Sequence, residues 1–461
     1  MAQRRSTDVA LDYVKALSPG VKANCWALAE AAGHEGWGRM QDLLRSYRWD
    51  WEDLRAELPR LAAAWVPDDP DDLVGPGLAI DETAQLKHGG DTSCVAPQHA
   101  GCTGKVENCV TTVFSAYVTA HGQAWVDFDL YMPERWANDD TRRTAAGIPE
   151  DLTFATKPEL AAEQLERLAA AGLPIGWAAF DEVYGRSEKL RKTAARAGLA
   201  YAAVIPCDYK VTLPSGAVTR ADEAATDALF ERRSCGNGSK GPRYSDWAMT
   251  ATAVDGQYLL VRRLISRPDA LTFYLCWAPP GRKATMTYFI TIAGRRWPVE
   301  ETFKTGKDVL GWDQAQVRTW DGSCRHTALS ALAQLRAAAV RGALTGTVAL
   351  PAADRDANPA TPGSHRDDDS EVGDTDLQFP VGDAPVPARA GLPCPPGIAP
   401  VKLSIAETAR LAALATRYTA GLISRAGLAF ALRWSLRRRR HQARARWHHY
   451  STRFAAAADT G

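Results

Sequence analysis

Three acidic residues, far apart along the chain, lie where metal-binding carboxylates would be expected. Asp81 stands near the end of an apolar run at 77–83, and Asp181 follows the apolar part of the run 175–185. Glu300 lies in a stretch with helical periodicity. Carboxylate oxygens are the ligands that Mg²⁺, a hard cation, prefers in proteins. The three residues therefore predict metal-dependent chemistry, provided that the fold brings them together.

Two basic residues flank Glu300 at helical spacing. At about 100° per residue, Glu300 lies about 40° and Lys307 about 20° from Arg296 around a helix axis. The three side chains would then share one narrow face. Charged residues four apart also form ordinary surface ion pairs. For an isolated helix, pairs of Arg296 and Lys307 with Glu300 and Glu301 are therefore the commoner explanation of this shared face.

The spacing of apolar residues changes after Pro67 from a helical to a strand pattern, and this change predicts the elements that must position these residues. Residues 77–83, 110–120 and 124–132 have strand patterns, and only the tripeptide HGQ separates the last two. A capped helix, the buried strand at 175–185, a second helix and a last strand follow. The order β-β-β-α-β-α-β predicts an α/β protein with an RNase H-like fold, in which a mixed five-stranded sheet carries flanking helices.

This fold predicts that the first two carboxylates meet. Its first and fourth strands are adjacent and parallel, which would place Asp81 and Asp181 within reach of shared metal ions. Residues 207–293 lose the alternation and contain two further strand runs, QYLLVRRLIS and LTFYLCWAPP. They predict a β-rich insertion, after which helical periodicity returns with Glu300.

The residues before Pro67 predict an all-α N-terminal domain, because their apolar positions recur three and four apart. Residues 26–45 contain two helical stretches joined by the turn GHEGW. This pattern fits a helix-turn-helix with Arg39 and Arg45 facing a DNA groove. Two helices packing around a glycine turn are commoner than that motif, and both interpretations stay open.

The C-terminal part of the chain divides by charge. Between 351 and 400, nine acidic residues stand against three basic ones, and ten of the 27 prolines fall there, which is typical of a disordered linker. Nine arginines and no acidic residue lie between Arg425 and Arg453. This basic tail could bind a polyanion or form a solvated basic face.

The predicted organisation is a helical N-terminal domain, a first part of the core, a β-rich insertion, a last part of the core with the Glu helix, an acidic linker and a basic helical tail. The N-terminal domain is residues 1–70, the first part of the core 71–206 and the insertion 207–293. The last part of the core is residues 294–348, the linker 349–403 and the tail 404–461.

Composition excludes several broad classes. With 461 residues, 46% of them hydrophobic and 24% charged, the chain is too long for a single small module and too apolar for wholesale disorder. The nine cysteines include no Cys-x-x-Cys pair, so neither a zinc ribbon nor a disulfide scaffold is indicated. There is no stretch of 18 uninterrupted apolar residues and no secretory signal, which predicts a cytoplasmic protein without a membrane partner.

At these residues the chain resembles the DDE transposases of bacterial insertion sequences, in the branch with a β-rich insertion before the final Glu. The family pattern of Arg, three residues, Glu, six residues and Lys is matched by Arg296, Glu300 and Lys307. The first two acids of the family are matched by Asp81 in AIDETAQLKHGG and by Asp181 in FDEVYGR.

Other stretches extend the resemblance over roughly residues 10–340. They include QHAGCTGKVENC, AAGIPEDLTFATKPEL, FYLCWAP and the pair Arg325 and His326. One departure is Ala293, three residues before the family's Arg, where some relatives place a Tyr.

The resemblance implies a two-metal mechanism on DNA. Water would free a 3′-OH at the transposon end, and this hydroxyl would then attack the other strand or the target. Asp81 would bridge two Mg²⁺ ions, for which Mn²⁺ could substitute, and Asp181 and Glu300 would each complete one. Arg296 and Lys307 would hold flanking phosphates.

The resemblance also implies partners and a location. The partners are double-stranded DNA, as transposon ends and target, and a second copy of the chain in a homodimeric paired-end complex; the location is the nucleoid in the cytoplasm.

Two other functions compete with that of a transposase that cleaves and joins DNA. One is a domesticated DNA-binding regulator that keeps the fold without cutting, and the other is a nuclease of the same fold without strand transfer. The presence of all three acids favours an active enzyme. Neither G-x-S-x-G, G-x-x-x-x-G-K-[ST] nor H-E-x-x-H occurs in the chain, so these other catalytic motifs are excluded.

Overall fold

The computed structural model describes residues 2–238, 241–282, 284–344, 400–401, 403–419 and 424–458. Nearly all of the predicted acidic linker, 349–403, lies outside these residues.

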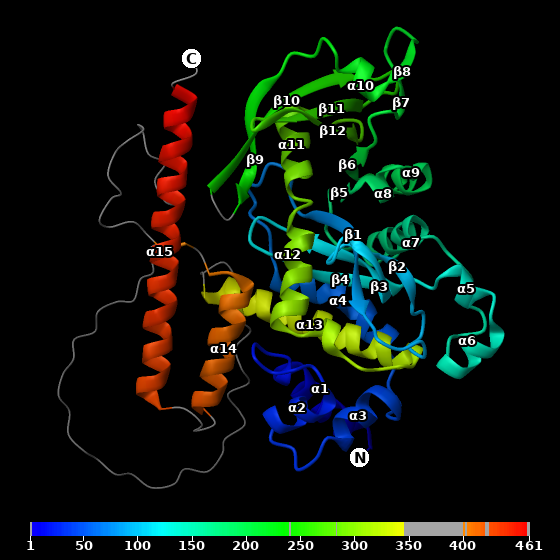
Figure 1. Ribbon diagram of the computed structural model, residues 1–461, viewed down its shortest axis with the longest axis vertical. Helices are drawn as coiled ribbons and strands as arrows, with labels where there is room; N and C mark the ends of the chain where they lie inside the picture. Colours follow the sequence, from blue (N-terminus) through cyan, green and yellow to red (C-terminus); the bar gives the residue numbers. More distant parts are fainter. Residues whose placement is uncertain are drawn as a thin grey trace, which may run out of the picture.

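A mixed sheet with RNase H-like strand order forms the centre of the molecule (Figure 1). Its five core strands are β1 (Gly77–Leu86), β3 (Lys105–Val118), β4 (Gln123–Leu130), β5 (Trp177–Phe180) and β6 (Ala200–Ile205). β3 pairs antiparallel with β1 and with β4, whereas β5 pairs parallel with β1 and with β6. The order β4-β3-β1-β5-β6 confirms the predicted fold class.

Aromatic side chains fill the space between the sheet and the helices that follow it. Phe114 of β3 stacks on Trp125 of β4 with ring centroids 4.2 Å apart, and Trp312 meets Phe114 edge to face at 5.3 Å. Phe303 lies 5.8 Å from Phe114. Such pairs add about 0.5–1.5 kcal/mol each beyond the burial of their area. They fix the segment that carries Glu300 against β1, β3 and β4.

Five strands outside the core order extend or border the sheet. β12 (Arg267–Trp277) pairs antiparallel with β6, and β11 (Gln257–Leu264), β10 (Gly241–Ala251) and β9 (Glu231–Gly238) continue from it. The prediction of only two strands here was wrong, because the polar, glycine-rich residues before 251 form a hairpin held by backbone pairing. Added strands cover the edge of β6, which would otherwise expose unpaired backbone groups. The short β2 (Ala96–Ala100), which pairs with β3, was also not predicted.

Four N-terminal helices divide between two apolar cores. α1 (Ala2–Ala16), α2 (Cys25–Ala31) and α3 (Gly38–Arg45) share a small core that includes residues of the last core helix, α13 (Trp320–Leu344). α4 (Trp51–Trp65) instead contributes to the main core beside the sheet.

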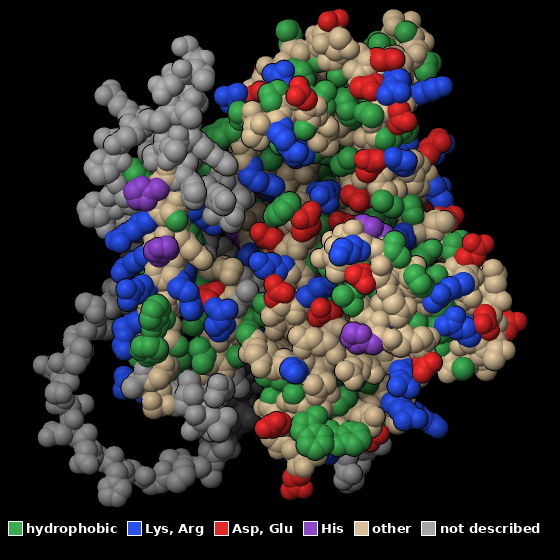
Figure 2. All heavy atoms as spheres, in the orientation of Figure 1, with side chains coloured by type: hydrophobic (Ala, Val, Ile, Leu, Met, Phe, Trp, Pro, Cys, Tyr) green, Lys and Arg blue, Asp and Glu red, His purple; other side chains and the backbone are tan. Residues whose placement is uncertain are grey.

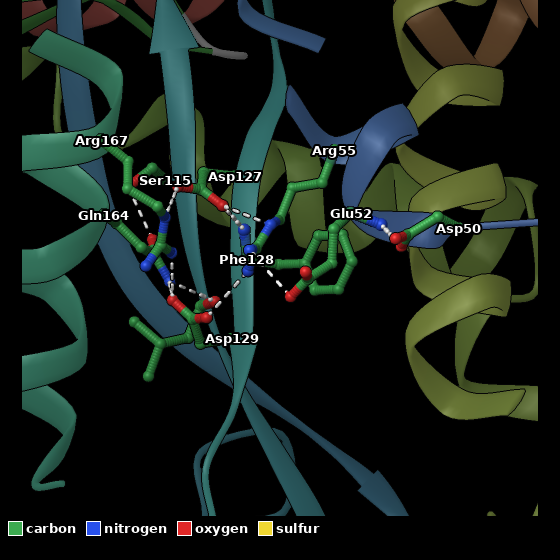
Figure 3. A network of polar contacts seen from close by, with 10 residues as sticks. Asp50, Glu52, Arg55, Ser115, Asp127, Phe128, Asp129, Gln164 and Arg167 are labelled. Carbon is green, nitrogen blue, oxygen red and sulfur yellow. Dashed lines mark hydrogen bonds and ion pairs between the residues drawn. The ribbon is translucent and has the colours of Figure 1, made fainter. Parts of the chain in front are cut away.

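A polar network fastens α4 and α7 (Lys157–Ala170) to β4 (Figure 3). Asp127 and Asp129 of β4 lie between Arg55 of α4 and Arg167 of α7. Only 4% of the Asp127 side chain is exposed, so these charges are largely withdrawn from water. The helix α7 begins with a capping box formed by Thr156 and Glu159.

The pair Arg325 and His326 on α13 joins the two cores. Arg325 donates to the backbone carbonyl of Trp49 at 3.0 Å. His326 is fully buried, with one ring nitrogen 2.9 Å from the Tyr13 hydroxyl and the other 2.9 Å from the carbonyl of Trp312. These family-like residues therefore hold the N-terminal helices to the core.

Protonation of His326 should destabilise the fold. Burial lowers the pKa of His326 to about 4, below its ordinary value of 6.5. The unfolded chain therefore takes up the proton first, and stability that is complete above about pH 6.5 falls as the pH drops toward 4. We expect a loss of up to about 3 kcal/mol, measured by urea unfolding at several pH values. The variant His326→Gln should lose less between pH 7 and pH 5; an unchanged pH dependence would assign the effect to other groups.

The C-terminal helices form a hairpin beside the core. α14 (Ile405–Thr419) packs on α13, and α15 (Arg425–Ala458) packs on α14 and reaches β10 (Figure 1). Arg438 pairs with Glu407 of α14 at 2.8 Å. Among the helices described, none is long and apolar enough to cross a membrane.

Candidate active site

Asp81 and its neighbour Glu82 point to opposite faces of the sheet, as successive residues of a strand do. Asp81 lies on the face covered by α12 (Pro298–Lys304), where Arg296 binds it. Glu82 faces the other helices, and it accepts hydrogen bonds from Lys157 at 2.8 Å and from the Tyr184 hydroxyl at 2.5 Å. No sequence pattern predicted this second set of contacts, although Lys157 lies in the family-like stretch ATKPEL.

Asp181 lies beside Asp81 because of the strand register. Ile80 of β1 is opposite Phe180 of the parallel strand β5, so the next residue of each strand is an aspartate. The strand ends at Phe180 and not at 185 as predicted, and Asp181 caps the short helix α8 (Glu182–Gly185). Its carboxylate accepts a hydrogen bond from the Tyr184 backbone N–H at 3.1 Å, which fixes its orientation.

Gly185 allows α8 to lie against the last core strand. A Cβ at this position would stand 1.9 Å from the carbonyl oxygen of Val204. We expect Gly185→Ala to lower stability by about 1–3 kcal/mol, because the backbone must move apart, and to shift the helix that Asp181 caps. Chemical denaturation should show the loss, whereas Gly36→Ala, which meets open space, should unfold like wild type. Equal stability of the two variants would contradict the close packing.

The segment that carries Glu300 is not the single helix that the sequence predicted. α11 (Met286–Gly294) ends before Arg296, α12 starts at Pro298, and a π-helical turn, Thr305–Val309, follows. Pro298 has no N–H to donate to the carbonyl of Gly294, which breaks the helix. Arg243 satisfies that carbonyl instead, at 2.9 Å.

Arg296 nevertheless joins two of the predicted site residues. Its Nη1 lies 3.2 Å from Asp81 Oδ2, and its Nη2 lies 3.0 Å from Glu300 Oε1. A single guanidinium thus holds both carboxylates. Lys307 lies in the π-helical turn and donates to the backbone carbonyl of Ala84 at 2.9 Å, so it is fixed to β1.

The two aspartates are costly to ionise together. Burial raises the pKa of Asp81 to about 8, and the charges of Asp181 and Glu82 add to this, while Arg296 opposes it. Burial also raises the pKa of Asp181. Partly buried carboxylates this close to one another favour a bound cation.

The donor chemistry at Asp81 and Asp181 fits a hard divalent cation such as Mg²⁺. Within the described ranges, no group of three or more His, Cys, Asp or Glu side chains is arranged to hold a metal ion. Glu300 is turned to Arg296. The aspartate pair therefore offers two carboxylates to a cation. The Arg296 guanidinium lies between Glu300 and Asp81 and pairs with both.

Arg39 and Arg45 lie on a different part of the molecule. Both are exposed on α3, whose buried side carries Met40, Leu43 and Leu44. Six residues apart, they project about 120° from each other around the helix. No contact found among the described residues joins them to the three acidic site residues, and their role in DNA binding stays a prediction.

Comparison with known sequences gives a family match for this chain. Residues 2–254, more than half of the chain, match the family described as DDE superfamily endonuclease. The matched residues include Asp81 and Asp181 and end before Glu300.

A curated relative is the probable transposase for insertion sequence element IS701 of Microchaete diplosiphon. It is 28% identical to this chain over 163 residues, which cover 35% of this chain and 38% of the relative. The aligned part thus spans well under half of that protein. With the family match across more than half of its length and an RNase H-like strand order, the chain belongs to the DDE superfamily endonucleases.

Proposed function

We propose that this protein is a transposase that cleaves DNA at insertion-sequence ends and transfers the strands into target DNA by a metal-dependent DDE mechanism. The observation that supports this most is the pair Asp81 and Asp181 at the ends of adjacent parallel strands. Glu300 lies close by, linked to Asp81 through Arg296.

Each site residue has a chemical role in this proposal. Asp81 and Asp181 would hold Mg²⁺ or Mn²⁺, with Glu300 completing the ligands once it leaves Arg296. When bound, the metal ions stabilise charge on the attacking and leaving oxygens of the phosphodiester. Arg296 would bind a flanking phosphate, because a guanidinium matches phosphate oxygens with two parallel hydrogen bonds. Lys307, already fixed to the backbone of β1, would present its charge at one position beside the DNA.

The DNA partner is supported by an arginine stripe on α15, defined as Arg433, Arg437, Arg440 and Arg444. These four exposed residues are spaced four, three and four apart, so they share one side of the helix. Lys and Arg side chains line α15 in Figure 2. A row of cations of this kind suits the phosphate backbone and carries no base readout.

Loss of the stripe should weaken binding to all duplexes alike. Changing its four arginines to Gln should flatten the plot of log affinity against log salt by up to about 3–4 units, since each phosphate contact contributes ~0.9. A charge-matched control changes Arg60, Arg186, Arg196 and Arg220, each exposed and ion-paired at a site away from α15. Equal slopes for the two variants would show that α15 is a solvated basic helix.

The decisive experiment incubates the full chain with duplexes that carry the inverted repeats flanking its own gene, in Mg²⁺ or Mn²⁺. We expect nicks that leave a 3′-OH, followed by joined products. Specific binding without any cut would favour the DNA-binding regulator, and cutting without joining would favour the nuclease. A homodimer in the paired-end complex and a nucleoid-associated location in the cytoplasm belong to the same proposal.

A further inference from the structure

Arg296 supplies the positive charge at the site. Among the described residues it is the one cationic side chain ion-paired with Asp81 or Glu300. The neighbouring lysines are used elsewhere: Lys157 pairs with Glu82, and Lys307 donates to a backbone carbonyl. The Arg296 side chain is 24% exposed, so its ion pairs are sheltered from water without being sealed from it.

The guanidinium contacts the oxygens that a metal would need. It binds Asp81 Oδ2 and Glu300 Oε1, which belong to two of the three carboxylates assigned to Mg²⁺ in the proposed function. A divalent cation and the guanidinium carry charge of the same sign and use the same lone pairs. The two therefore compete for these carboxylates.

A phosphodiester offers Arg296 an alternative partner. Arg binds phosphate and carboxylate with the same planar fork of N–H donors. Arg296 lies between α11 and α12, outside both helices, where its backbone is not part of a continuous helix. The Arg296 guanidinium can thus exchange its carboxylate partners for a phosphate near Asp81 without the unwinding of a regular helix.

We propose that Arg296 is a displaceable internal counter-ion that keeps Asp81 and Glu300 from binding a divalent cation until DNA takes up its guanidinium. This inference rests on the proposed function and adds a coupling to it: DNA and metal ions each raise the affinity for the other. Such coupling is reciprocal by thermodynamic necessity. The arrangement would limit metal loading in the absence of substrate.

The test measures Mn²⁺ binding to the DNA-free full chain by electron paramagnetic resonance of the free ion. We expect Arg296→Gln to bind Mn²⁺ at least about fivefold more tightly than wild type, within the usual range of coupling between sites. Arg296→Lys, which keeps the charge but loses the fork, should fall between them. Lys304→Gln removes an exposed charge from α12, the helix that carries Glu300, and should bind like wild type.

The outcomes separate this inference from the proposed function. If Arg296→Gln is folded by circular dichroism and binds Mn²⁺ no more tightly than wild type, the counter-ion role is wrong. If Arg296→Gln fails to fold, Arg296→Lys decides the question by the same comparison with wild type. If Asp81→Asn has no effect on Mn²⁺ binding with or without DNA, the proposed metal site itself fails.

Added duplex DNA gives a second readout. Its phosphates contribute metal ligands in every variant, so Mn²⁺ affinity should rise in all of them. The rise should be larger in wild type than in Arg296→Gln, because only wild type has a guanidinium to release. Equal gains in the two proteins would contradict the coupling.

Discussion

Asp81→Asn should reduce cleavage of a cognate DNA end by about 10³-fold or more while leaving DNA binding largely intact. The change removes a metal ligand, whose contribution to the transition state amounts to several kcal/mol, and no phosphate contact. Asn keeps the shape of the side chain and can still accept a hydrogen bond from Arg296. Cleavage and binding of the same labelled duplex, measured side by side, check both parts.

Misfolding can be separated from loss of chemistry in this variant. Burial and the neighbouring Asp181 disfavour the ionised form of Asp81, whose pKa is raised to about 8. Replacing the carboxylate by a neutral amide should therefore not lower the unfolding midpoint at pH 8. Asp91→Asn, an exposed residue of the loop after β1, serves as the control that keeps full activity. Cleavage by Asp81→Asn within tenfold of wild type would contradict the proposed function.

Glu300→Gln extends this prediction to the third acid. The family match ends at residue 254, so Glu300 is assigned by its spacing from Arg296 and Lys307 and by its ion pair with Arg296. We expect a similar loss of cleavage. Normal cleavage by Glu300→Gln would leave the aspartate pair as the site and remove the third ligand.

The fold around the aspartates could be predicted from sequence because local and long-range signals agree there. The apolar runs before Asp81 and Asp181 are buried on both faces, as a central parallel pair must be, and their order fixes which strands are neighbours. Once β1 and β5 pair, one register places the two carboxylates side by side. The site thus follows from topology more than from any single motif.

Other features depend on contacts that sequence periodicity does not report. The break before Pro298 is stabilised by Arg243, which is 55 residues away in the chain and reaches the Gly294 carbonyl. The π-helical turn lets Gly306 pass Trp125, where a Cβ would lie 2.1 Å from the ring. The hairpin of β9 and β10 is held by backbone pairing in polar sequence. A 3.6-residue period could not anticipate any of these.

Arg167→Gln should destabilise the protein by about 1–3 kcal/mol, because it takes the closer cation away from the buried carboxylate of Asp127. The loss stays below that for a fully buried pair, since the Arg167 side chain is 36% exposed and Arg55 still pairs with Asp129. Arg167 binds Asp127 at 3.0 Å and Asp129 at 2.5 Å (Figure 3). Without it, the nearest cation to Asp127 in the described part of the chain is the Nε of Arg55, at 3.9 Å. Chemical denaturation at pH 7 measures the loss.

A second substitution should recover much of that stability. Burial, with the adjacent Asp129, already raises the pKa of Asp127 to about 6 despite the two arginines. Asp127→Asn in the Arg167→Gln background removes the charge that has lost its partner, so the double variant should be more stable than Arg167→Gln alone. The gain measures how much of the cost was electrostatic, because Arg167 also packs its stem against its neighbours.

The pH dependence of the stability of Arg167→Gln gives an independent test of the electrostatic explanation. The folded pKa of Asp127 is above its unfolded value of 3.8, so its ionisation costs stability as the pH rises toward 6. Loss of Arg167 should raise the pKa of Asp127 in the folded protein further. The pH range over which ionisation of Asp127 costs stability then extends above 6. Arg167→Gln should therefore be closer to wild type at pH 5 than at pH 7. A deficit that is the same at both pH values, and that Asp127→Asn does not reduce, would mean that Arg167 stabilises α7 against β4 by packing alone.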